Sequence, residues 1–386
     1  MTDIKILGVK INNLNNSELL ANIKACLAGD QPHQIATVNP EFLLEARRND
    51  EFLSLLNKLD LRLADGFGLQ CSALVKGRLL ARHTGADLVI DLLNLANTND
   101  LTIAVINRRD GLSSASDISQ ALTKSWPSLK FKILEPDLDQ VLNSDNELNE
   151  LSADIIFCAL GSPAQEQLLF TILPKSSAKI GIGVGGSFDY LTGRAKRAPR
   201  LMQSLGLEWL WRLMINPRLR IKRIFNAVIK FPFYFILDDL IHPWFYRPNV
   251  VAFIYQGDEI LIINSAKEEG EFWKLPQGGI EAHENAEQAV RREMTEELQL
   301  DNFSISAIYY NIYRYDWPDG YTIRGYRGQR LNLCLINYQG AKDAIQLNWE
   351  NRDYKWVKID NLLDAVDPIV RPATELFLKK YKEFIK

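Results

Sequence analysis

The sequence contains few residues that could form cross-links. It has only four cysteines in 386 residues, and no two of them form a Cys-x-x-Cys pair. They are Cys26, Cys71, Cys158 and Cys334. Most of them have apolar neighbours, and such cysteines are typical of buried free thiols in a reducing compartment. We therefore expect no disulfides and place the chain in the cytoplasm.

The sequence also lacks an apolar stretch long enough to cross a membrane. A spanning helix needs roughly 18 or more apolar residues in succession. The closest segment, residues 224–237, is interrupted by Lys230 and Pro232. No signal peptide is recognisable in the first residues, MTDIKILGVKINN. If the segment 224–237 contacts a membrane, we expect it to lie in the interface.

A general excess of positive charge is missing as well. Lysine and arginine number 45 against 48 acidic residues, so the net charge is −3, which argues against general nucleic-acid binding. Basic residues are nevertheless concentrated in residues 194–230, where ten of them accompany a single acid, Glu208. Trp209, Trp211 and Leu213 lie among them. This mixture is typical of a segment on an anionic membrane surface, and a solvated helix face is the alternative.

Apolar segments followed by helical patterns recur in the first part of the chain. We expect strands at residues 4–9, 34–38, 61–64, 101–106, 131–134, 155–160 and 179–184. Repeated strand–helix units predict an α/β fold with a parallel sheet covered on both faces. Ligands bind beyond the carboxyl ends of the strands in such sheets. The residues expected there are Asn39, Asp65, the turn at 161–163 and the stretch 183–187.

The composition changes after residue 236, which predicts a second domain. Asp238, Asp239 and the sequence His-Pro-Trp at 242–244 are typical of a boundary, and residues 249–264 predict a β-hairpin. A chain of 386 residues is long for one domain and comfortable for two. We therefore expect domains at residues 1–240 and 248–386.

Glycines open a long stretch at residues 185–213, which reads GGSFDYLTGRAKRAPRLMQSLGLEWLWRL. It resembles the signature of the WecG/TagA/CpsF family of bacterial glycosyltransferases, with its Phe-Asp, Arg-Ala-Pro and Gly-Leu-Glu-Trp elements in order. Residues 37–41, 63–68 and 161–166 resemble the same family. The resemblance implies a Rossmann-like glycosyltransferase domain over about residues 1–240. Its basic, membrane-contacting segment would span about residues 196–240.

This resemblance implies an inverting sugar transfer in cell-surface polysaccharide synthesis. The family moves N-acetylmannosamine or a related sugar from a UDP-sugar to a polyprenyl-diphosphate-linked acceptor, and no metal or other cofactor is expected for this domain. The reaction needs a carboxylate that takes the proton of the acceptor hydroxyl. The family's proposed base matches Asp65, which lies in an Asp-Gly turn. A purely structural turn is the alternative interpretation.

The same resemblance assigns further residues to substrate binding. Those expected to contact the donor or the acceptor are Thr37, Asn39, Arg82 and Gln165. Four arginines of the basic segment could offset diphosphate charge. They are Arg212, Arg218, Arg220 and Arg223. The structural alternatives are hydrogen bonds at turns and strand ends or solvation at the surface.

Two local features bear on the identity of the donor sugar and on metal dependence. After the strand expected at 101–106 the family usually has a glycine-rich turn, whereas residues 107–111 here read Asn-Arg-Arg-Asp-Gly. The identity of the donor sugar is therefore left open. Asp137 and Asp139 have the Asp-x-Asp spacing of metal-dependent glycosyltransferases. They also follow a proline, as the first turn of a helix often does, and we favour this helix start.

A second motif begins at Gly278, and residues 278–300 read GGIEAHENAEQAVRREMTEELQL. They resemble the Nudix box, in which a Gly, five residues, a Glu and seven residues precede Arg-Glu-apolar-x-Glu-Glu-x-Gly-apolar. The residues in place include Gly278, Glu284, Arg292, Glu293, Glu296 and Glu297. Gln299 replaces the second glycine of the box. The resemblance implies an α/β/α-sandwich Nudix domain at about residues 248–386.

The spacing of the box glutamates explains the chemistry expected of them. Glu293 precedes Glu296 and Glu297 by three and four residues, so a helix places all three on one face. Mg²⁺ or Mn²⁺ would offset their repulsion and hold a substrate diphosphate. We assign all three to the metal, and Glu296 and Glu297 also to catalysis. Arg292 is expected to pair with Glu284 and so fix the loop on the helix.

Two runs of residues that flank the box resemble one particular group of Nudix hydrolases. Residues 272–279, FWKLPQGG, resemble dinucleoside polyphosphate hydrolases and RNA 5′-pyrophosphate hydrolases. Glu350 precedes Trp356 by six residues, in a run similar to the Glu-Phe-x-x-Trp-x-Trp of that group. It is therefore a candidate for a further metal ligand or a base. Asn351 and Tyr354 replace the phenylalanine and the first tryptophan.

Two functions agree with these motifs. The first is a bifunctional enzyme that transfers a sugar and also hydrolyses a nucleoside diphosphate-linked substrate. The alternative is a Nudix hydrolase docked at the membrane by a catalytically degenerate transferase domain. We expect a peripheral protein at the inner face of the cell membrane. Its expected partners are a UDP-sugar, a polyprenyl-diphosphate-linked acceptor, a nucleotide and the membrane surface, with nucleic acid only as an RNA 5′ end.

Overall fold

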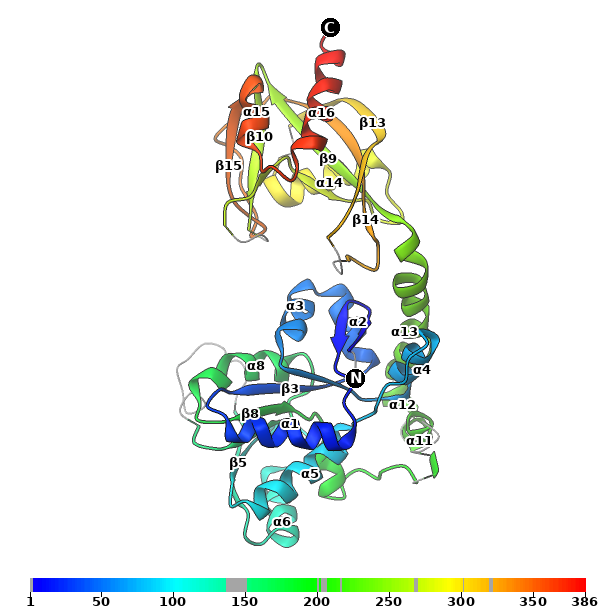
Figure 1. Cartoon of the computed structure of the whole chain (residues 1–386), viewed down its shortest axis with the longest axis vertical. Helices are drawn as coiled ribbons and strands as arrows, with labels where there is room; N and C mark the ends of the chain where they lie inside the picture. The colour runs from blue at the N-terminus through cyan, green and yellow to red at the C-terminus, as the bar shows by residue number, and fades with distance from the viewer. Residues whose placement is uncertain are drawn as a thin grey trace. The chain divides into compact units, whose positions relative to one another are not determined.

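The computed structural model describes residues 3–136, 151–199, 201–202, 207–215, 217–266, 270–300, 302–318 and 322–386. Within these ranges the side chains of residues 209, 212 and 217–220 are not described. The chain divides into two compact units, Met1–Asp239 and Leu240–Lys386. Figure 1 shows the helices and strands of both units.

The first unit is built on a six-stranded parallel sheet in the order β4-β3-β8-β7-β5-β6. The strands are β3 (His33–Val38), β4 (Leu61–Ala64), β5 (Thr102–Ile106), β6 (Lys130–Leu134), β7 (Ile155–Cys158) and β8 (Ile180–Gly183). Every residue of β4, β7 and β8 is buried, as parallel strands covered on both faces require. The expected α/β fold with a parallel sheet is confirmed.

Helices cover the two faces of this sheet (Figure 1). One face carries α1 (Asn16–Ala28), α5 (Gly85–Thr98) and α6 (Ala115–Ser125), whose apolar side chains pack against alternate strand residues. The other face carries α8 (Ala164–Ile172). The remaining helices of this region are α2 (Pro40–Arg48), α3 (Asp50–Lys58), α4 (Phe67–Val75) and α9 (Ser187–Leu191).

Two sequence-based expectations about local structure are wrong. Residues 4–9 form an antiparallel hairpin of β1 (Ile4–Ile6) and β2 (Val9–Ile11), and the chain turns at Leu7 and Gly8 with φ angles of 46° and 83°. Glycine adopts such positive φ angles without a steric penalty. Cys158 and Cys334 are buried, but Cys71 on α4 is exposed and Cys26 is partly exposed. Apolar neighbours in the sequence did not bury Cys71 because successive helical residues face different directions.

A helical arm (residues 217–239) forms the end of the first unit. It contains α12 (Pro217–Phe225), the π-helical turn η2 (Asn226–Lys230), α13 (Phe231–Phe235) and the start of η3 (Ile236–Ile241), and α11 (Glu208–Ile215) precedes it. Phe231 and Phe235 are buried, and Phe231 packs against the bare backbone of Gly68. None of the described helices combines the length and the apolar character that a membrane crossing requires.

Two acidic residues anchor this arm. Asp238 is buried and receives a two-pronged ion pair from Arg47 on α2, with Nε–Oδ2 at 2.5 Å and Nη2–Oδ1 at 3.2 Å. Asp239 accepts the backbone N–H of Leu7 and pairs with Lys76 at 2.9 Å. The arm is thus tied to α2, to the end of α4 and to the β1–β2 turn.

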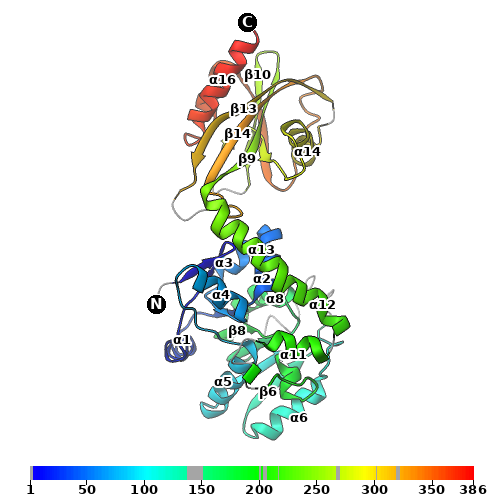
Figure 2. The ribbon, with the colours of Figure 1, turned by 90° about the vertical axis from the view of Figure 1, so that its right-hand side faces the viewer.

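The second unit contains a seven-stranded sheet in the order β11-β10-β9-β14-β13, with β12 paired to β9 and β15 to β10. The strands are β9 (Tyr246–Gln256), β10 (Glu259–Ser265), β11 (Trp273–Lys274), β12 (Gln277–Gly279), β13 (Phe303–Asp316), β14 (Gly328–Tyr338) and β15 (Asn351–Lys358). Helices α14 (Ala286–Leu298) and α16 (Arg371–Phe384) cover opposite faces, each over its own apolar cluster (Figure 2). The expected α/β/α sandwich is confirmed.

Replacing Asp238 by alanine should strongly destabilise the first unit. The change would leave the Arg47 guanidinium in a largely buried position without its carboxylate, and breaking such a pair costs roughly 3–5 kcal/mol. Thermal unfolding of the full-length variant should therefore show a large decrease in the Tm of the first unit. Lys130→Ala breaks an exposed pair with Asp100 and should cost at most about 1 kcal/mol. Equal losses in both variants would contradict the anchoring role of Asp238.

Candidate active sites

A cleft of about 720 Å³ lies at the carboxyl ends of the strands in the first unit. Its walls come from the loops after β3, β4, β5, β7 and β8, from α2 and from the helical arm. The structure brings these predicted site residues together in its lining: Thr37, Asn39, Asp65, Gln165 and Arg223. Arg82 is not among the described lining residues, although its charge contributes to lowering the pKa of the nearby Asp87.

Asp65 follows β4 directly and lines the cleft. Its backbone N–H donates to the carbonyl of Val38 at 2.7 Å, which fixes the residue beside the end of β3. Its Oδ2 accepts the N–H of Gly85, the first residue of α5, at 3.4 Å. The positive end of a helix favours a negatively charged carboxylate. The arrangement therefore suits a group that must be ionised before it can accept a proton.

The N-terminus of α5 is held in place by a second set of contacts. The N-cap Thr84 and Asp87 bond to each other, and Arg197 donates to both carboxylate oxygens of Asp87 at 2.6 and 2.8 Å. The hydrogen bonds from Arg197 lower the pKa of Asp87. Sequence reasoning assigned no role to Arg197, although the Arg-Ala-Pro element contains it. Its contacts link the glycosyltransferase signature to the helix that holds Asp65.

The sequence predicts that Thr37 and Asn39 contact the substrate. In the structure, both side chains contact other parts of the protein. The side-chain oxygen of Asn39 accepts the N–H groups of Glu41 and Phe42 and so caps α2. Thr37 is buried, and a Cβ on Gly85 would lie only 3.2 Å from its hydroxyl oxygen. Glycine at position 85 therefore allows α5 to approach β3 closely. The contacts of Thr37 and Asn39 with a sugar stay predictions.

Both the oxygen and the nitrogen of the Gln165 side-chain amide form hydrogen bonds. Its Oε1 accepts the N–H groups of Gly161 at 3.1 Å and Gly185 at 3.0 Å, while its Nε2 donates to Oε1 of Glu166 at 2.6 Å. The side chain thus ties together two glycine loops of the cleft. A Cβ at Gly183 would overlap both Gln165 and Glu166, so the end of β8 has room only for glycine. A direct contact of Gln165 with the donor stays a prediction.

Glu166 lies next to Gln165 and is 1% exposed. Its backbone carbonyl accepts a hydrogen bond from the side chain of Gln34 on β3 at 2.9 Å. Burial raises the pKa of its carboxyl to about 7. The sequence predicts no role for Glu166, although it lies in the stretch 161–166, because the burial of a helical carboxylate cannot be predicted from local spacing.

The loop that replaces the family's glycine-rich turn contributes side chains to the cleft. Arg108 and Leu112 belong to the lining, and Arg108 pairs with Asp110 of the same loop at 2.6 and 2.8 Å. Ser113 then donates to Asp189 of the signature at 2.7 Å. The possible metal pair Asp137 and Asp139 lies outside the described residues.

Of the four arginines expected to bind a diphosphate, the structure describes the side chain of one, Arg223. Arg223 on α12 forms an ion pair with Glu41 at the start of α2, with Nε at 3.0 and 2.8 Å from the two carboxylate oxygens. Its charge is therefore offset by a carboxylate at the cleft. The side chains of Arg212, Arg218 and Arg220 lie outside the described part of the chain.

In the second unit, Arg292 connects the parts of the Nudix-like motif. It donates to both oxygens of Glu284, at 2.7 and 3.0 Å, and to the carbonyl of Gly279 at 2.9 Å. These hydrogen bonds lower the pKa of Glu284 to about 2. The pair holds the loop after β12 on helix α14, which is the role that the sequence assigns to it.

The glutamates of the motif lie together on one side of α14. Arg292 Nη1 donates to Glu293 at 2.8 Å and to Glu296 at 3.1 Å, and Glu297 is buried at 7% exposure. Burial raises the pKa of Glu293, and the charges of Glu296 and Glu350 raise it further. The structure thus brings the carboxylate of Glu350, from the segment before β15, close to the box.

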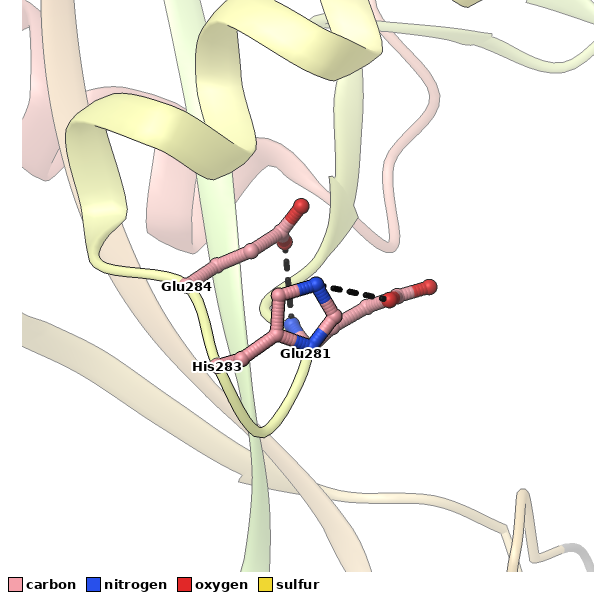
Figure 3. Close-up of side chains that lie close together, drawn as sticks. All are labelled: Glu281, His283 and Glu284. Carbon is pink, nitrogen blue, oxygen red and sulfur yellow. Dashed lines mark hydrogen bonds and ion pairs between the residues drawn. The ribbon is translucent and has the colours of Figure 1, made fainter.

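Among the described residues, a second cluster of side chains also contains possible metal ligands. Glu281, His283 and Glu284 can place three ligand atoms within 4.8 Å of one another (Figure 3). Glu284 is already engaged by Arg292, and it also accepts the backbone N–H of Glu281 at 3.1 Å. These contacts make Glu284 part of the loop fixation, so we assign no ion to this group.

Gln299 stands where the motif has its second glycine. It ends α14 in the left-handed conformation, with φ 51° and ψ 37°, and its N–H bonds back to the last turn. This is the usual position of a C-terminal glycine. The substitution therefore leaves the helix end intact in shape, although a side chain in this conformation is sterically unfavourable.

The match to known families covers both units. The model of the glycosyl transferase WecG/TagA/CpsF family matches residues 4–243, which is more than half of the chain. The chain belongs to this family. The model of the NUDIX domain matches residues 245–377. The protein is therefore an enzyme with a glycosyltransferase domain and a Nudix hydrolase domain.

Two curated relatives of the first domain have names that state the same activity. The N-acetylglucosaminyldiphosphoundecaprenol N-acetyl-beta-D-mannosaminyltransferase of Staphylococcus aureus (strain MRSA252) is 28% identical over 219 residues, which cover 55% of this chain and 85% of the relative. The enzyme of the same name from Bacillus subtilis (strain 168) is 31% identical over 186 residues, which cover 47% and 72%.

Solved structures similar to the second unit include an Ap4A hydrolase of C. elegans in a binary complex. It has a TM-score of 0.29 and 18% identity and covers 36% of this chain and 97% of its own. The dihydroneopterin triphosphate pyrophosphohydrolase of E. coli has a TM-score of 0.27 and 19% identity and covers 35% and 98%.

A Nudix domain depends in general on a divalent metal ion, and the box residues fit one. A Cβ at Gly278 would overlap the Glu293 carboxylate, so that carboxylate lies directly against the backbone of β12. Glu296 and Glu350 add negative charge at the same place. Carboxylate oxygens are the ligands that Mg²⁺ and Mn²⁺ prefer. The donation of Arg292 to two of these carboxylates shows that positive charge is accommodated between them.

The buried carboxyl of Glu166 should make the stability of the first unit depend on pH. Its pKa is about 7 in the folded unit and near 4.5 when exposed, so the folded unit binds the proton more tightly. The free energy of unfolding should therefore fall as the pH rises from about 4.5 through 7, by roughly 3 kcal/mol in total. The Tm of the first unit, measured between pH 5 and 8.5, checks this slope.

Glu166→Gln is the control for this measurement, since it keeps the shape of the side chain but cannot ionise. The variant should lose the part of the pH dependence that arises between pH 4.5 and 7, whatever its absolute Tm. If the Tm of the first unit depended on pH equally in the wild type and the variant, ionisation of Glu166 would not destabilise the folded unit.

Proposed function

We propose that the first unit transfers an N-acetylmannosamine-type sugar from a UDP-sugar to a polyprenyl-diphosphate-linked acceptor, with inversion. The observation that carries this proposal is the carboxylate of Asp65, which lines the cleft and accepts the first N–H of α5. Family membership supports the reaction type, and the names of the relatives support the sugar and the acceptor. Cell-surface polysaccharide synthesis is the process that such a transfer would serve.

In this proposal Asp65 takes the proton of the acceptor hydroxyl while the acceptor oxygen bonds to the anomeric carbon. The bond from that carbon to the diphosphate breaks, and UDP leaves with the electron pair. Arg223 offsets the diphosphate charge after exchanging Glu41 for a phosphate. The other residues proposed for substrate are Thr37, Asn39, Arg82, Gln165, Arg212, Arg218 and Arg220. No metal is assigned to this step.

For the second unit we propose metal-dependent hydrolysis of a nucleoside diphosphate-linked substrate. The ion, Mg²⁺ or Mn²⁺, would polarise a phosphoryl oxygen or activate a water molecule. Glu293, Glu296, Glu297 and Glu350 would hold it. Arg292 fixes the loop through Glu284 and steadies two of the carboxylates. The carboxylates near Glu293 support this proposal most directly.

We also propose that the helical arm lies on the inner face of the cell membrane. Five apolar side chains on the arm expose between 49% and 65% of their surface: Ile221, Phe225, Ile229, Phe233 and Ile236. Lys222 and Lys230 are exposed beside them, and such cations attract anionic lipids. Arg223, Asn226, Lys230 and Tyr234 of the same arm line the cleft. The arm would thus present a lipid-linked acceptor to Asp65.

A second candidate function is a Nudix hydrolase docked at the membrane by an inactive transferase domain. The observation that favours it is the loop at 107–112, where Arg108 and Leu112 enter the cleft in place of a glycine-rich turn. The two candidates differ in whether the first unit transfers sugar.

Exchanging one carboxylate in each unit should separate the two activities. Asp65→Asn should reduce sugar transfer by about 10²-fold or more, because the amide cannot accept the proton. It should leave magnesium-dependent release of phosphate or nucleotide unchanged. Glu296→Gln should do the reverse, because it removes one metal ligand charge. Near-normal transfer by Asp65→Asn would exclude Asp65 as the base, and a wild type without transfer would favour the second candidate.

Membrane binding should depend on the exposed side chains of the arm. The full-length triple variant Ile221→Ser, Phe225→Ser, Phe233→Ser should bind anionic phospholipid vesicles at least tenfold more weakly than the wild type, since it buries less apolar surface. Binding of the wild type should weaken as salt is added. Leu20→Ser on α1, where Leu20 is also exposed, is the control. Co-sedimentation that is equal for all three proteins would rule the arm out as the membrane contact.

A further inference from the structure

The loop after β5 in the first unit is fixed at both of its ends. At its start Asn107 is buried, and its side-chain nitrogen donates to the carbonyl of Ser113 at 3.0 Å and to Oε1 of Glu135 at 2.8 Å. At its end the hydroxyl of Ser113 donates to Asp189 at 2.7 Å. Arg108, which lines the cleft, therefore extends from a backbone with a defined position.

Arg108 differs in origin from the other cations of the cleft. Four basic residues in the described lining come from α2 and the helical arm: Arg47, Arg48, Arg223 and Lys230. Arg108 comes from the loop after β5. Within the described lining, it alone places positive charge on the wall that the loops after β5, β7 and β8 form.

The strand order places Arg108 across the cleft from Asp65. Asp65 follows β4 and Arg108 follows β5, and the strands β3, β8 and β7 lie between them. With the usual spacing of strands, the two backbone positions are ~19 Å apart. In an inverting displacement, the nucleophile and the leaving group are on opposite sides of the anomeric carbon. A base at Asp65 therefore requires the leaving diphosphate on the far side, which is the side of Arg108.

The glycine loops between these two positions use their N–H groups within the protein. Those of Gly161 and Gly185 both donate to Oε1 of Gln165, at 3.1 and 3.0 Å. The guanidinium of Arg108 pairs with Asp110 of its own loop, and the two side chains expose 55% and 72% of their surface. Exposed ion pairs of this kind contribute little to stability. A phosphate can therefore replace the carboxylate of Asp110 with little loss.

We infer that Arg108 binds the diphosphate of the UDP-sugar donor on the wall opposite Asp65, where a phosphate takes the place of Asp110. This inference rests on the sugar transfer proposed above. A guanidinium forms parallel hydrogen bonds with phosphate oxygens as it does with a carboxylate. When the bond to the anomeric carbon breaks, Arg108 offsets the charge that the diphosphate gains. The loop that replaces the family's glycine-rich turn thus serves the transferase.

The test uses the full-length protein with Arg108→Gln, and Arg109→Gln is the matched control. Arg109 belongs to the same loop, donates to the carbonyl of Glu135 at 3.2 Å and is not among the described lining residues. Arg108→Gln should weaken the binding of UDP about tenfold in calorimetry, because it removes a charged donor to phosphate. It should lower kcat/KM for the donor by at least the same factor and leave the KM of the acceptor unchanged. Arg109→Gln should change none of these quantities.

Asp110→Asn separates phosphate binding from a role of the ion pair in shaping the loop. This variant should bind UDP at least as tightly as the wild type, because a neutral amide competes less for the guanidinium. A loss of UDP affinity as large as that of Arg108→Gln would overturn the inference. Unchanged UDP affinity in Arg108→Gln, or an equal loss in Arg109→Gln, would do the same.

The binding of UDP does not require sugar transfer, so the two proposals can fail separately. A wild type that binds UDP through Arg108 but transfers no sugar would refute the proposed transfer and retain the nucleotide site. A wild type that transfers sugar equally well with Arg108→Gln would retain the transferase and refute the role of Arg108.

Discussion

The ion pair between Arg47 and the buried Asp238 determines much of what the first unit can do. Arg47 belongs to α2, whose N-terminus is capped by Asn39 at the end of β3. Its guanidinium also lies 3.8 Å from the centre of the Tyr234 ring. Through these contacts the helical arm is held against the sheet domain, and Tyr234, Lys230 and Arg223 line the cleft. Without the pair, that wall of the cleft would lose its fixed position.

The two units arrange charge in two different ways. In the first unit, glycine loops, a helix N-terminus and an arginine surround the cleft, and the carboxylate of Asp65 lines it. In the second unit, several carboxylates are brought together despite their repulsion, and this requires positive charge among them. Arg292 supplies part of that charge, which agrees with the general need of Nudix domains for a divalent ion.

Much of the fold could be predicted from the sequence because the strands are short apolar segments and the box has fixed helical spacing. The positions of Asp65 at the end of β4 and of the glutamates on α14 follow from such local patterns. The roles of Arg197, Glu166 and Asp238 could not be predicted, because each depends on a partner far away in the sequence or on burial. The hairpin at residues 4–11 was missed because its turn contains only one glycine, within a continuous apolar run.

The helical arm has a consequence for insertions and deletions. Its exposed residues Ile221, Phe225, Ile229 and Phe233 are spaced by four, whereas an α-helix has 3.6 residues per turn, so the stripe would wind by ~40° at each step in a plain α-helix. The π-helical turn η2 holds an extra residue within this span. Removing one residue there would rotate all that follows by ~100° relative to α12. The arm can therefore vary in composition. Its number of residues is constrained, because its exposed apolar side chains and its cleft-lining side chains must both keep their directions.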